Sequence, residues 1–270
     1  MDSTRTETGK EKSSLTKNTI FQACGICQHF GGVRAVDGLD VEVTEGEIFG
    51  IIGPNGSGKS TFFNSLSGIY KPTGGKFVFR GKDITGLEPH IIVKQGISRT
   101  FQNLRTFGSM TVLENVVIGN HVRQSVGVID SLFRTPIYRV EEKRSREKAD
   151  ELLKLVGLSH MRNNLSCGMS YGQQKRLELA RSLAGDADML LLDEPTAGIP
   201  EKDANELMEL IRNIRDQHGA TILIIEHNMR VMTRLADRIM AMDRGRKIAE
   251  GLPEDVLRDP HVIKAYLGEE

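Results

Sequence analysis

The chain has 270 residues, 39% apolar and 27% charged, a composition typical of a globular protein rather than a disordered one. Lysine plus arginine and aspartate plus glutamate each number 36, so the formal net charge is zero, which argues against a dedicated nucleic-acid-binding protein. No apolar run approaches the roughly 20 residues of a membrane-spanning helix, and Met1–Lys12 lacks the apolar segment of a signal peptide, so we expect a cytoplasmic protein.

The N-terminal part of the chain predicts an antiparallel sheet. Residues 1–15 are rich in Ser, Thr, Lys and Glu, and we expect a flexible tail there. From about Ile20 to Val43, short apolar stretches alternate with turn signals at Gly31-Gly32 and Asp37-Gly38. This alternation is the pattern of strands joined by tight turns.

A continuous apolar run at Ile48–Ile52 is typical of a buried parallel strand. A glycine-rich loop follows it, and Ser60–Leu66 is a plausible helix. After a turn marked by Pro72 and two glycines, the strand pattern resumes at Lys76–Phe79.

The middle of the chain predicts helices. Residues 141–156 carry apolar side chains at helical spacing, and Gly157 marks the end of that helix. A second helix is indicated by the same spacing farther along. Its apolar positions are Leu177, Ala180, Leu183 and Ala184.

The last third alternates between strands and helices, which predicts a parallel sheet and an α/β fold. We expect a strand at Met189–Leu192, a helix at Ala204–Asp216 and a strand at Thr221–Ile225. Ile239–Met242 and Lys247–Ala249, joined by a turn, are expected to form a closing hairpin.

Cys24 and Cys27 form a C-x-x-C pattern that could belong to a redox pair or half of a zinc site. No second pair is present, since Cys167 is alone, and residues three apart on a strand point to opposite faces. We therefore interpret these cysteines as small buried hydrophobic residues. His29 and the other histidines apart from His227 are interpreted as surface or packing residues.

The strongest motif is the glycine-rich loop. It reads Gly53-Pro54-Asn55-Gly56-Ser57-Gly58-Lys59-Ser60-Thr61, which satisfies G-x-x-x-x-G-K-[S/T]. The glycines let successive backbone N–H groups face an anion, and the following helix adds its positive end. Lys59 should reach the β- and γ-phosphates, while the Ser60 hydroxyl should bind Mg²⁺.

Two carboxylates follow the apolar run at Met189–Leu192. This pattern alone would usually be a strand that meets a solvated turn, but ligands bind beyond the carboxyl ends of parallel strands. Downstream of a phosphate-binding loop, we expect Asp193 to hold the hydrated Mg²⁺ and Glu194 to act as general base on the attacking water.

Three further polar segments complete the candidate site. Gln102 could present its amide to the metal and to the water. His227 follows a predicted strand and could contact the γ-phosphate, although a lone His or Gln is more often structural. Ser170-Tyr171-Gly172-Gln173 precedes a helix and could be a plain N-cap or a second phosphate cradle, which one chain would need only for a partner's nucleotide.

From about Thr19 to the C-terminus, these motifs resemble the ABC ATPase family. Gly53–Thr61 is similar to the Walker A loop of that family, and Leu190–Glu194 is similar to its Walker B strand. Gln102 resembles the Q-loop, His227 the switch histidine and Ser170–Gln173 the signature motif. Phe30 lies where the family stacks an aromatic ring on adenine, although it could equally be a core residue.

The resemblance implies a P-loop NTPase (RecA-like) core with an N-terminal antiparallel β-subdomain and an inserted α-helical subdomain. A single ABC ATPase domain is expected over residues 16–270. Its expected parts are 16–102 (β-subdomain and Walker A), 103–180 (helical subdomain with the signature), 181–252 (Walker B and switch histidine) and 253–270 (C-terminal helical tail).

The resemblance also implies partners. Two ATPase subunits, identical or different, close head to tail around ATP and Mg²⁺. They drive membrane permease subunits from the inner face of the cell membrane, served indirectly by a periplasmic or extracellular substrate-binding protein. No nucleic-acid partner is expected.

Within the family, the chain is most similar to the LivG-type ATPases of branched-chain amino-acid importers. The matching stretches are Arg99–Gln102, Met110–Gly119, Leu132–Glu142, the Ser-Tyr-Gly-Gln-Gln form of the signature, and Ala265–Glu269. ATPases of urea importers and lipopolysaccharide exporters remain alternatives.

Other functions and several departures from the family pattern stay open. A soluble ABC ATPase that acts on DNA or ribosomes is a less favoured alternative, and Glu194 with His227 argues against a regulator that does not hydrolyse ATP. Met169 and Tyr171 depart from the commonest signature. Pro200 replaces the Asn or Asp that many D-loops carry, and it lacks a backbone donor.

Overall fold

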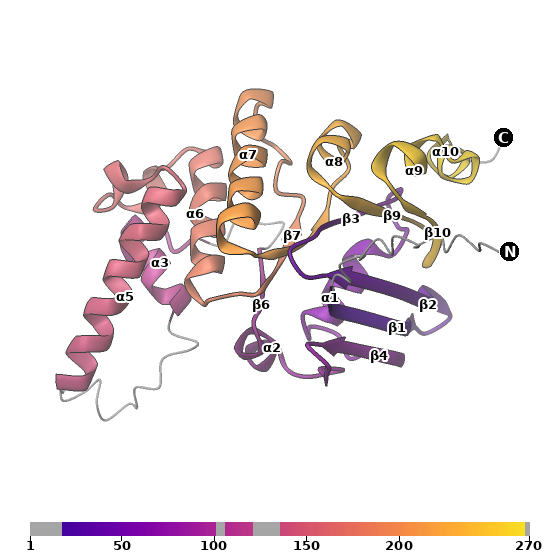
Figure 1. Cartoon of the computed structure of the whole chain (residues 1–270), viewed down its shortest axis with the longest axis horizontal. Coiled ribbons are helices and arrows are strands. Elements are labelled where there is room, and N and C mark those ends of the chain that lie inside the picture. The colour runs from indigo at the N-terminus through magenta and orange to yellow at the C-terminus, as the bar shows by residue number, and fades with distance from the viewer. Residues whose placement is uncertain (1–17, 101–105, 121–135, 268–270) are drawn as a thin grey trace, which may run out of the picture.

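The computed structural model describes residues 18–100, 106–120 and 136–267. The expected tail at residues 1–15 lies outside this part of the chain. The described residues form two sheets and a group of helices that extends to one side of them (Figure 1).

The N-terminal sheet has the strand order β2-β1-β4-β5 and is antiparallel, as the sequence predicts. Its strands are β1 (Thr19–Phe30), β2 (Val33–Thr44), β4 (Gly74–Phe79) and β5 (Lys82–Asp83). The turn expected at Asp37-Gly38 is wrong, because β2 continues through it. Gly38 has a φ of 69°, and the pairing register with β1 shifts nearby, so a bulge takes the place of a turn.

The second sheet has the order β10-β9-β3-β8-β7-β6, with all strands parallel except β10. Its strands are β3 (Ile48–Ile52), β6 (Ile97–Arg99), β7 (Met189–Asp193), β8 (Thr221–Ile225), β9 (Arg238–Asp243) and β10 (Arg246–Gly251). Every residue of β3, β7 and β8 is buried, because both faces of this sheet are covered.

Helix α1 (Lys59–Leu66) fills the space between the two sheets. Phe62, Phe63 and Leu66 are fully buried in one cluster with side chains from both sheets. Burying such large side chains is worth about 1.5–3 kcal/mol each. This packing fixes the helix start, and with it the glycine-rich loop, against the ends of β3.

The opposite face of the parallel sheet is covered by helices α6 (Tyr171–Ala184), α7 (Glu201–His218), α8 (Met229–Leu235) and α9 (Pro253–Arg258). Alternate residues of each strand point to this side; on β8 these are Ile222 and Ile224, whereas Leu223 and Ile225 face α1. Because alternate side chains of each strand point to opposite faces, this one sheet contributes to two separate hydrophobic cores.

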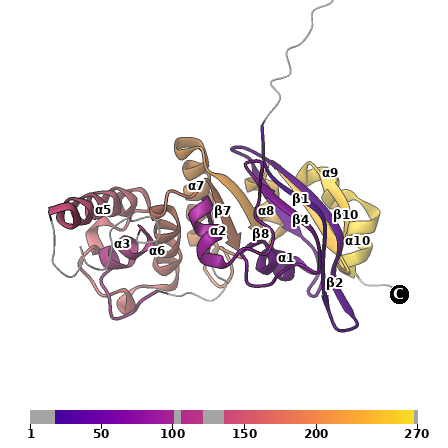
Figure 2. The ribbon, with the colours of Figure 1, turned by 90° about the horizontal axis from the view of Figure 1, so that it is seen from below.

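Helices α3 (Val112–Asn120), α5 (Pro136–Leu155) and α6 form the part that projects from the sheets (Figures 1 and 2). Helix α5 begins before the predicted start, at Pro136, a residue suited to a first helical turn. Helices α2 (Pro89–Gln95) and α10 (Pro260–Leu267) complete the α-helices of the described residues. Across the described ranges, no helix combines the length and apolar character needed to traverse a bilayer.

The burial expected for the first two cysteines is wrong. Both lie on β1, but Cys24 is exposed and Cys27 is half-buried. Gly25 between them has a φ of 58°, and the pairing of β1 with both neighbours shifts register there. This bulge breaks the alternation of faces on which the expectation rested.

Candidate functional site

Three neighbouring parallel strands bring the candidate residues to one edge of the sheet. Strand β8 lies between β3 and β7. The glycine-rich loop follows β3, Asp193 ends β7, and His227 comes two residues after β8. Since the carboxyl ends of parallel strands share an edge, residues far apart in sequence meet there.

The glycine-rich loop has a shape that only glycine allows at two positions. At Gly58 the φ is 105°, and a Cβ atom would lie 2.2 Å from the Ala35 carbonyl oxygen. At Gly53 the φ is 152°, and a Cβ would lie 2.2 Å from the Met242 carbonyl oxygen. The loop therefore packs backbone against backbone and begins α1 at Lys59.

Lys59 is buried at the centre of this loop. Its Nζ donates to the carbonyl oxygens of Gly53 at 2.7 Å and Pro54 at 2.9 Å, and to the Ser57 hydroxyl at 3.3 Å. Burial lowers the pKa of Lys59, while the charges of Glu194 and Asp193 act to raise it. A desolvated ammonium group binds an anion strongly, and the two nearby carboxylates can bind a metal ion that accompanies the anion.

Asp193 is paired with a residue to which the sequence analysis gave no role. The Nη2 of Arg99 donates to Asp193 Oδ2 at 2.8 Å, and the two side chains are only 9% and 4% exposed. Arg99 also donates to the Asn64 side chain and to the Ser67 hydroxyl, both at 2.8 Å. The available sequence signal was a charged residue at the end of β6, the strand that pairs with β7.

Glu194 and His227 lie in direct contact. His227 Nε2 is 2.7 Å from Glu194 Oε1, and the two side chains are 39% and 15% exposed. Glu194 has a left-handed backbone, with a φ of 49°, and its N–H donates to the carbonyl oxygen of Ile225 at 2.9 Å. The strained turn at the end of β7 thus turns this carboxylate toward the segment that follows β8.

Glu226 is a second residue that sequence reasoning missed. It is 3% exposed, and its Oε1 accepts hydrogen bonds from the N–H and hydroxyl of Thr196 at 2.8 and 2.6 Å. Its other oxygen accepts from the His227 N–H at 3.2 Å. A buried carboxylate needs such donors, and this one ties the loop after β7 to the loop that carries His227.

The serine segment begins helix α6 in the projecting part. The Ser170 hydroxyl accepts from the Gln173 N–H at 3.3 Å, and the Ser170 N–H donates to Gln173 Oε1 at 2.9 Å. This is a complete capping box. Tyr171 is 44% exposed. Near it, a Cβ on Gly198 would lie 3.4 Å from the Tyr171 ring, so the segment touches the loop before α7.

Pro200 ends that loop and occupies the N-cap of α7. A proline suits this position because only its carbonyl is needed, and that oxygen accepts from the Ala204 N–H at 2.9 Å. No side-chain cap bond is made there, so the helix starts on the backbone carbonyl of the proline alone.

Phe30 and Gln102 complete the predicted residues. Phe30 ends β1, is 44% exposed, and packs edge-to-face on Tyr70 with ring centroids 5.2 Å apart. The expectation that it could be a core residue is therefore wrong. Gln102 lies outside the described residues.

The arrangement fits a metal-bound triphosphate. The loop offers a cradle lined by backbone groups, Lys59 supplies a cation, and Ser60 lies exposed in the first turn of α1. Hydroxyl and carboxylate oxygens, as on Ser60 and Asp193, are ligands that Mg²⁺ prefers. A carboxylate and an imidazole in contact beyond the cradle can move a proton from water.

Fold and site together define a P-loop nucleotide hydrolase. Residues 36–197 match the family described as ABC transporter, and residues 246–270 match that described as branched-chain amino acid ATP-binding cassette transporter. The chain belongs to the ABC transporter family and is an ATP-binding, ATP-hydrolysing member of it.

Named relatives and a solved structure agree with this assignment. The chain is 41% identical over 250 residues to the high-affinity branched-chain amino acid transport ATP-binding proteins BraF of Pseudomonas aeruginosa and LivG of Escherichia coli K12. In both cases the match covers 93% of this chain and 98% of the relative. A crystal structure of an ATP-binding cassette of an ABC transporter in its ADP conformation has a TM-score of 0.82 and 36% identity, over 93% of this chain and all of that one.

Proposed function

We propose that this chain is the ATPase subunit of an importer of branched-chain amino acids. The support is the match of its C-terminal segment, residues 246–270, together with the names of relatives that match 93% of the chain. The contact between Glu194 and His227 beside the phosphate cradle carries the hydrolytic part of the proposal.

The phosphate cradle has assigned roles in this proposal. Backbone N–H groups from Gly53 to Ser60 and the ammonium of Lys59 hold the triphosphate. Ser60, Asp193 and Gln102 hold Mg²⁺, which when bound neutralises phosphate charge. Phe30 stacks on the adenine; its exposed ring at the end of β1 is free to do so on one face.

The hydrolytic step rests on the contacting pair. Glu194 accepts the proton of the attacking water, and His227 holds that carboxylate in place through the 2.7 Å contact. Arg99 acts as a positioning residue, since it fixes Asp193 from the side of β6.

The rest of the catalytic site comes from a second ATPase subunit. Ser170, Tyr171, Gly172 and Gln173 lie at the start of α6 in the projecting part; Ser170 and Gln173 cap the helix, and the Tyr171 ring is exposed. We assign them to the partner's nucleotide. In the proposed single domain of residues 16–270, this motif belongs to the helical segment 103–180, whereas the cradle belongs to the segment 16–102.

The partners of the assembled pair follow from the proposed transport function. Membrane permease subunits would hold it at the cytoplasmic face of the membrane. A substrate-binding protein on the other side would deliver the amino acid.

The hydrolytic assignment is tested with Glu194→Gln. We expect Mg·ATP binding to persist, steady hydrolysis to fall by about 10²–10⁴-fold, and a nucleotide-bound dimer to accumulate in size-exclusion chromatography. The matched control is Glu201→Gln, an exposed carboxylate in the first turn of α7, which should hydrolyse normally. Wild-type turnover by Glu194→Gln would refute the general-base role.

The substrate is tested by reconstitution. The chain is assembled in proteoliposomes with the permease and binding protein encoded beside it, and uptake of labelled leucine, isoleucine and valine is compared with uptake of urea. We expect ATP-dependent uptake of the three amino acids only. Urea uptake, or ATP-driven movement of lipopolysaccharide outward, would identify one of the alternatives instead.

A further inference from the structure

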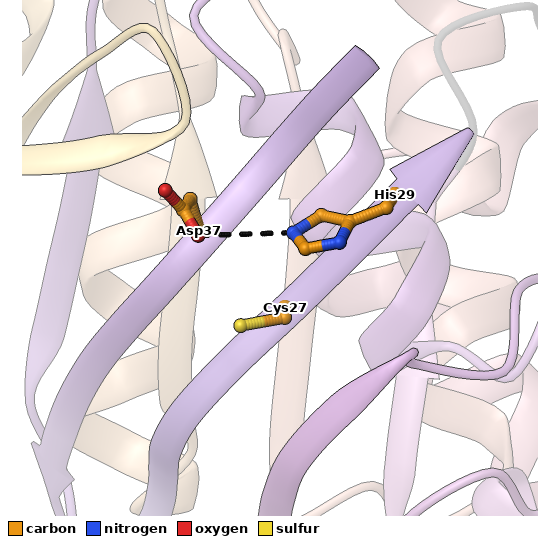
Figure 3. Close-up of side chains that lie close together, drawn as sticks. All are labelled: Cys27, His29 and Asp37. Carbon is orange, nitrogen blue, oxygen red and sulfur yellow. Dashed lines mark ion pairs between the residues drawn. The ribbon is translucent and has the colours of Figure 1, made fainter. Parts of the chain in front are cut away.

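A cluster of three potential metal ligands lies on the β1–β2 ribbon, outside the nucleotide site. Cys27 and His29 come from β1 and Asp37 comes from β2 (Figure 3). One ligand atom from each residue lies within 4.8 Å of the other two, and all three residues are half-buried. Figure 3 shows the His29 ring reaching across toward Asp37, with the Cys27 sulfur on the same side.

Strand geometry explains why these residues meet. Cys27 and His29 are two residues apart, so their side chains share one face of β1. On the neighbouring strand, Val36 is paired with Gln28, which places Asp37 opposite Cys27, and the His29 ring reaches it diagonally (Figure 3). The Asp37 N–H also donates to the carbonyl oxygen of Gly245 at 2.9 Å, so its backbone is fixed.

The carboxylate of Asp37 has one oxygen directed at the cluster. Arg246 donates a hydrogen bond to its Oδ2 at 2.7 Å, and Arg34 Nη1 lies 3.5 Å from the same oxygen. Asp37 Oδ1 lies 3.7 Å from His29 Nε2. The arginines therefore hold one oxygen and leave the other facing the imidazole.

The His29 imidazole has unused binding capacity. His29 Nε2 is buried and makes no hydrogen bond to any group in the described part of the chain. A buried polar nitrogen in that state is costly unless something else binds it. The Cys27 sulfur accepts from the Gly38 N–H at 3.2 Å, and its thiol donates to the Gly25 carbonyl oxygen at 3.6 Å, a weak hydrogen bond that metal binding would replace.

We propose that Cys27, His29 and Asp37 form a site for Zn²⁺. Thiolate, imidazole and carboxylate are the donors that zinc takes, and a half-buried position leaves its fourth place for solvent. The thiol proton leaves to solvent on binding, so thiolate and carboxylate together balance the charge of the ion. Bonds of about 2.0–2.3 Å require the three half-buried side chains to close in by about an ångström, which side-chain rotation would provide.

The site clamps the ribbon at a defined place. A bound ion would link β1 to β2 directly before Phe30 and the turn at Gly31-Gly32. This inference does not depend on ATP hydrolysis, because it rests on residues apart from the cradle. In this proposal Cys27 and His29 bind the metal, whereas the sequence pattern indicated only structural or packing roles for them. Cys24 is not part of the site, so the two cysteines of the C-x-x-C pattern do not bind the metal together.

The test is a zinc titration of the full-length chain against a chromophoric chelator, without nucleotide. We expect one zinc equivalent per chain in the wild type, and about a 100-fold or greater weakening in Cys27→Ser and His29→Asn, each of which loses a direct ligand. Cys24→Ser and Cys167→Ser remove exposed thiols elsewhere and should bind as the wild type does. With cobalt in place of zinc, thiolate-to-metal charge-transfer absorption should appear in the wild type and be absent from Cys27→Ser.

Opposite results would overturn the site. Equal zinc binding by Cys27→Ser and Cys24→Ser would show adventitious thiol binding only. Unchanged affinity in His29→Asn would remove the imidazole from the ligand set, and no retained equivalent in the wild type would refute the proposal. Circular dichroism and the Tm of each variant in chelator establish that it is folded, and zinc should raise the Tm of the wild type but not that of Cys27→Ser.

Discussion

The cradle edge of the sheet and the start of helix α6 handle their polar groups in opposite ways. At the cradle edge, Lys59 is buried, Asp193 is bound by Arg99, and Glu194 touches His227, so each group depends on a distant segment. At the start of α6, Ser170 and Gln173 satisfy each other within four residues of chain. One region is assembled by the tertiary fold, and the other is complete as a local motif.

This difference shows which part of a catalytic site a single chain can finish. The cradle edge contains a cation, two carboxylates and an imidazole brought together by three adjacent strands. The serine segment has helix N–H groups and a hydroxyl but no acid or base of its own. Substitutions at the cradle edge should therefore disturb contacts between distant segments, whereas those at the start of α6 should cost no more stability than the loss of a helix cap.

Lys59→Ala should have the largest effect on the cradle edge. Charge-assisted hydrogen bonds to phosphate each contribute about 1.5–3 kcal/mol, so we expect Mg·ATP affinity to fall about 100-fold or more and hydrolysis to disappear. Isothermal titration calorimetry measures the affinity. Lys94→Ala, which removes an exposed lysine of α2, is the matched control. Wild-type affinity in Lys59→Ala would place the triphosphate elsewhere.

Arg99→Met should expose how strongly the cradle edge depends on buried pairing. Removal of Arg99 leaves the Asp193 carboxylate buried without its cation, at a cost of about 3–5 kcal/mol in the free energy of unfolding. Arg146→Met breaks an exposed pair with Glu142 on α5 and should cost only about 0.3–0.5 kcal/mol. Urea unfolding gives both values, and equal losses would contradict the tertiary origin of the Asp193 position.

Ser170→Ala tests the other side of the comparison. Loss of this N-cap should cost about 1 kcal/mol of stability and, in addition, lower ATP hydrolysis. Thr111→Ala is the matched control, because Thr111 forms the same reciprocal bonds with Glu114 at the start of α3. It should lose similar stability at unchanged turnover. Equal turnover in the two variants would reduce the serine segment to a helix cap.

Tyr266, at the back of the cradle, should change the stability of the fold only at alkaline pH. Burial raises the pKa of this phenol to about 12, opposed by a hydrogen bond with the Gly53 backbone. Because the folded pKa lies above the ordinary value of 10.0 for a tyrosine, its contribution to stability is complete below pH 10 and is lost as the pH rises toward 12. Since the side chain is 38% exposed, that contribution should stay below about 2 kcal/mol.

Absorbance of the phenolate ion measures this directly. The folded chain, which has four tyrosines, should show one late ionisation near pH 12, and Tyr266→Phe should remove that step. Tyr171→Phe should leave the step in place. If the late ionisation persists in Tyr266→Phe, it belongs to another tyrosine, and the contact between Tyr266 of α10 and the Gly53 backbone would be refuted.

Local patterns predicted the elements that carry strong local signals. The apolar runs of β3, β7 and β8 predicted buried parallel strands. The spacing of apolar residues in α7 predicted a covering helix, and the glycines after β3 predicted a phosphate-binding loop. Short elements such as β6 and α8 lack enough residues for a period to be visible. The bulges in β1 and β2 escaped prediction because one extra residue reverses the faces of all that follow.

Short stretches of consecutive residues carry the available chemistry: a cradle, an acid pair, a switch histidine and a capping box. Which of these groups meet depends on the folded arrangement of the strands. Strand order set His227 against Glu194, the pairing of β6 with β7 set Arg99 on Asp193, and the pairing of β1 with β2 brought Cys27, His29 and Asp37 together. Such contacts join residues many positions apart, and their energy depends on burial and distance, which no local pattern encodes.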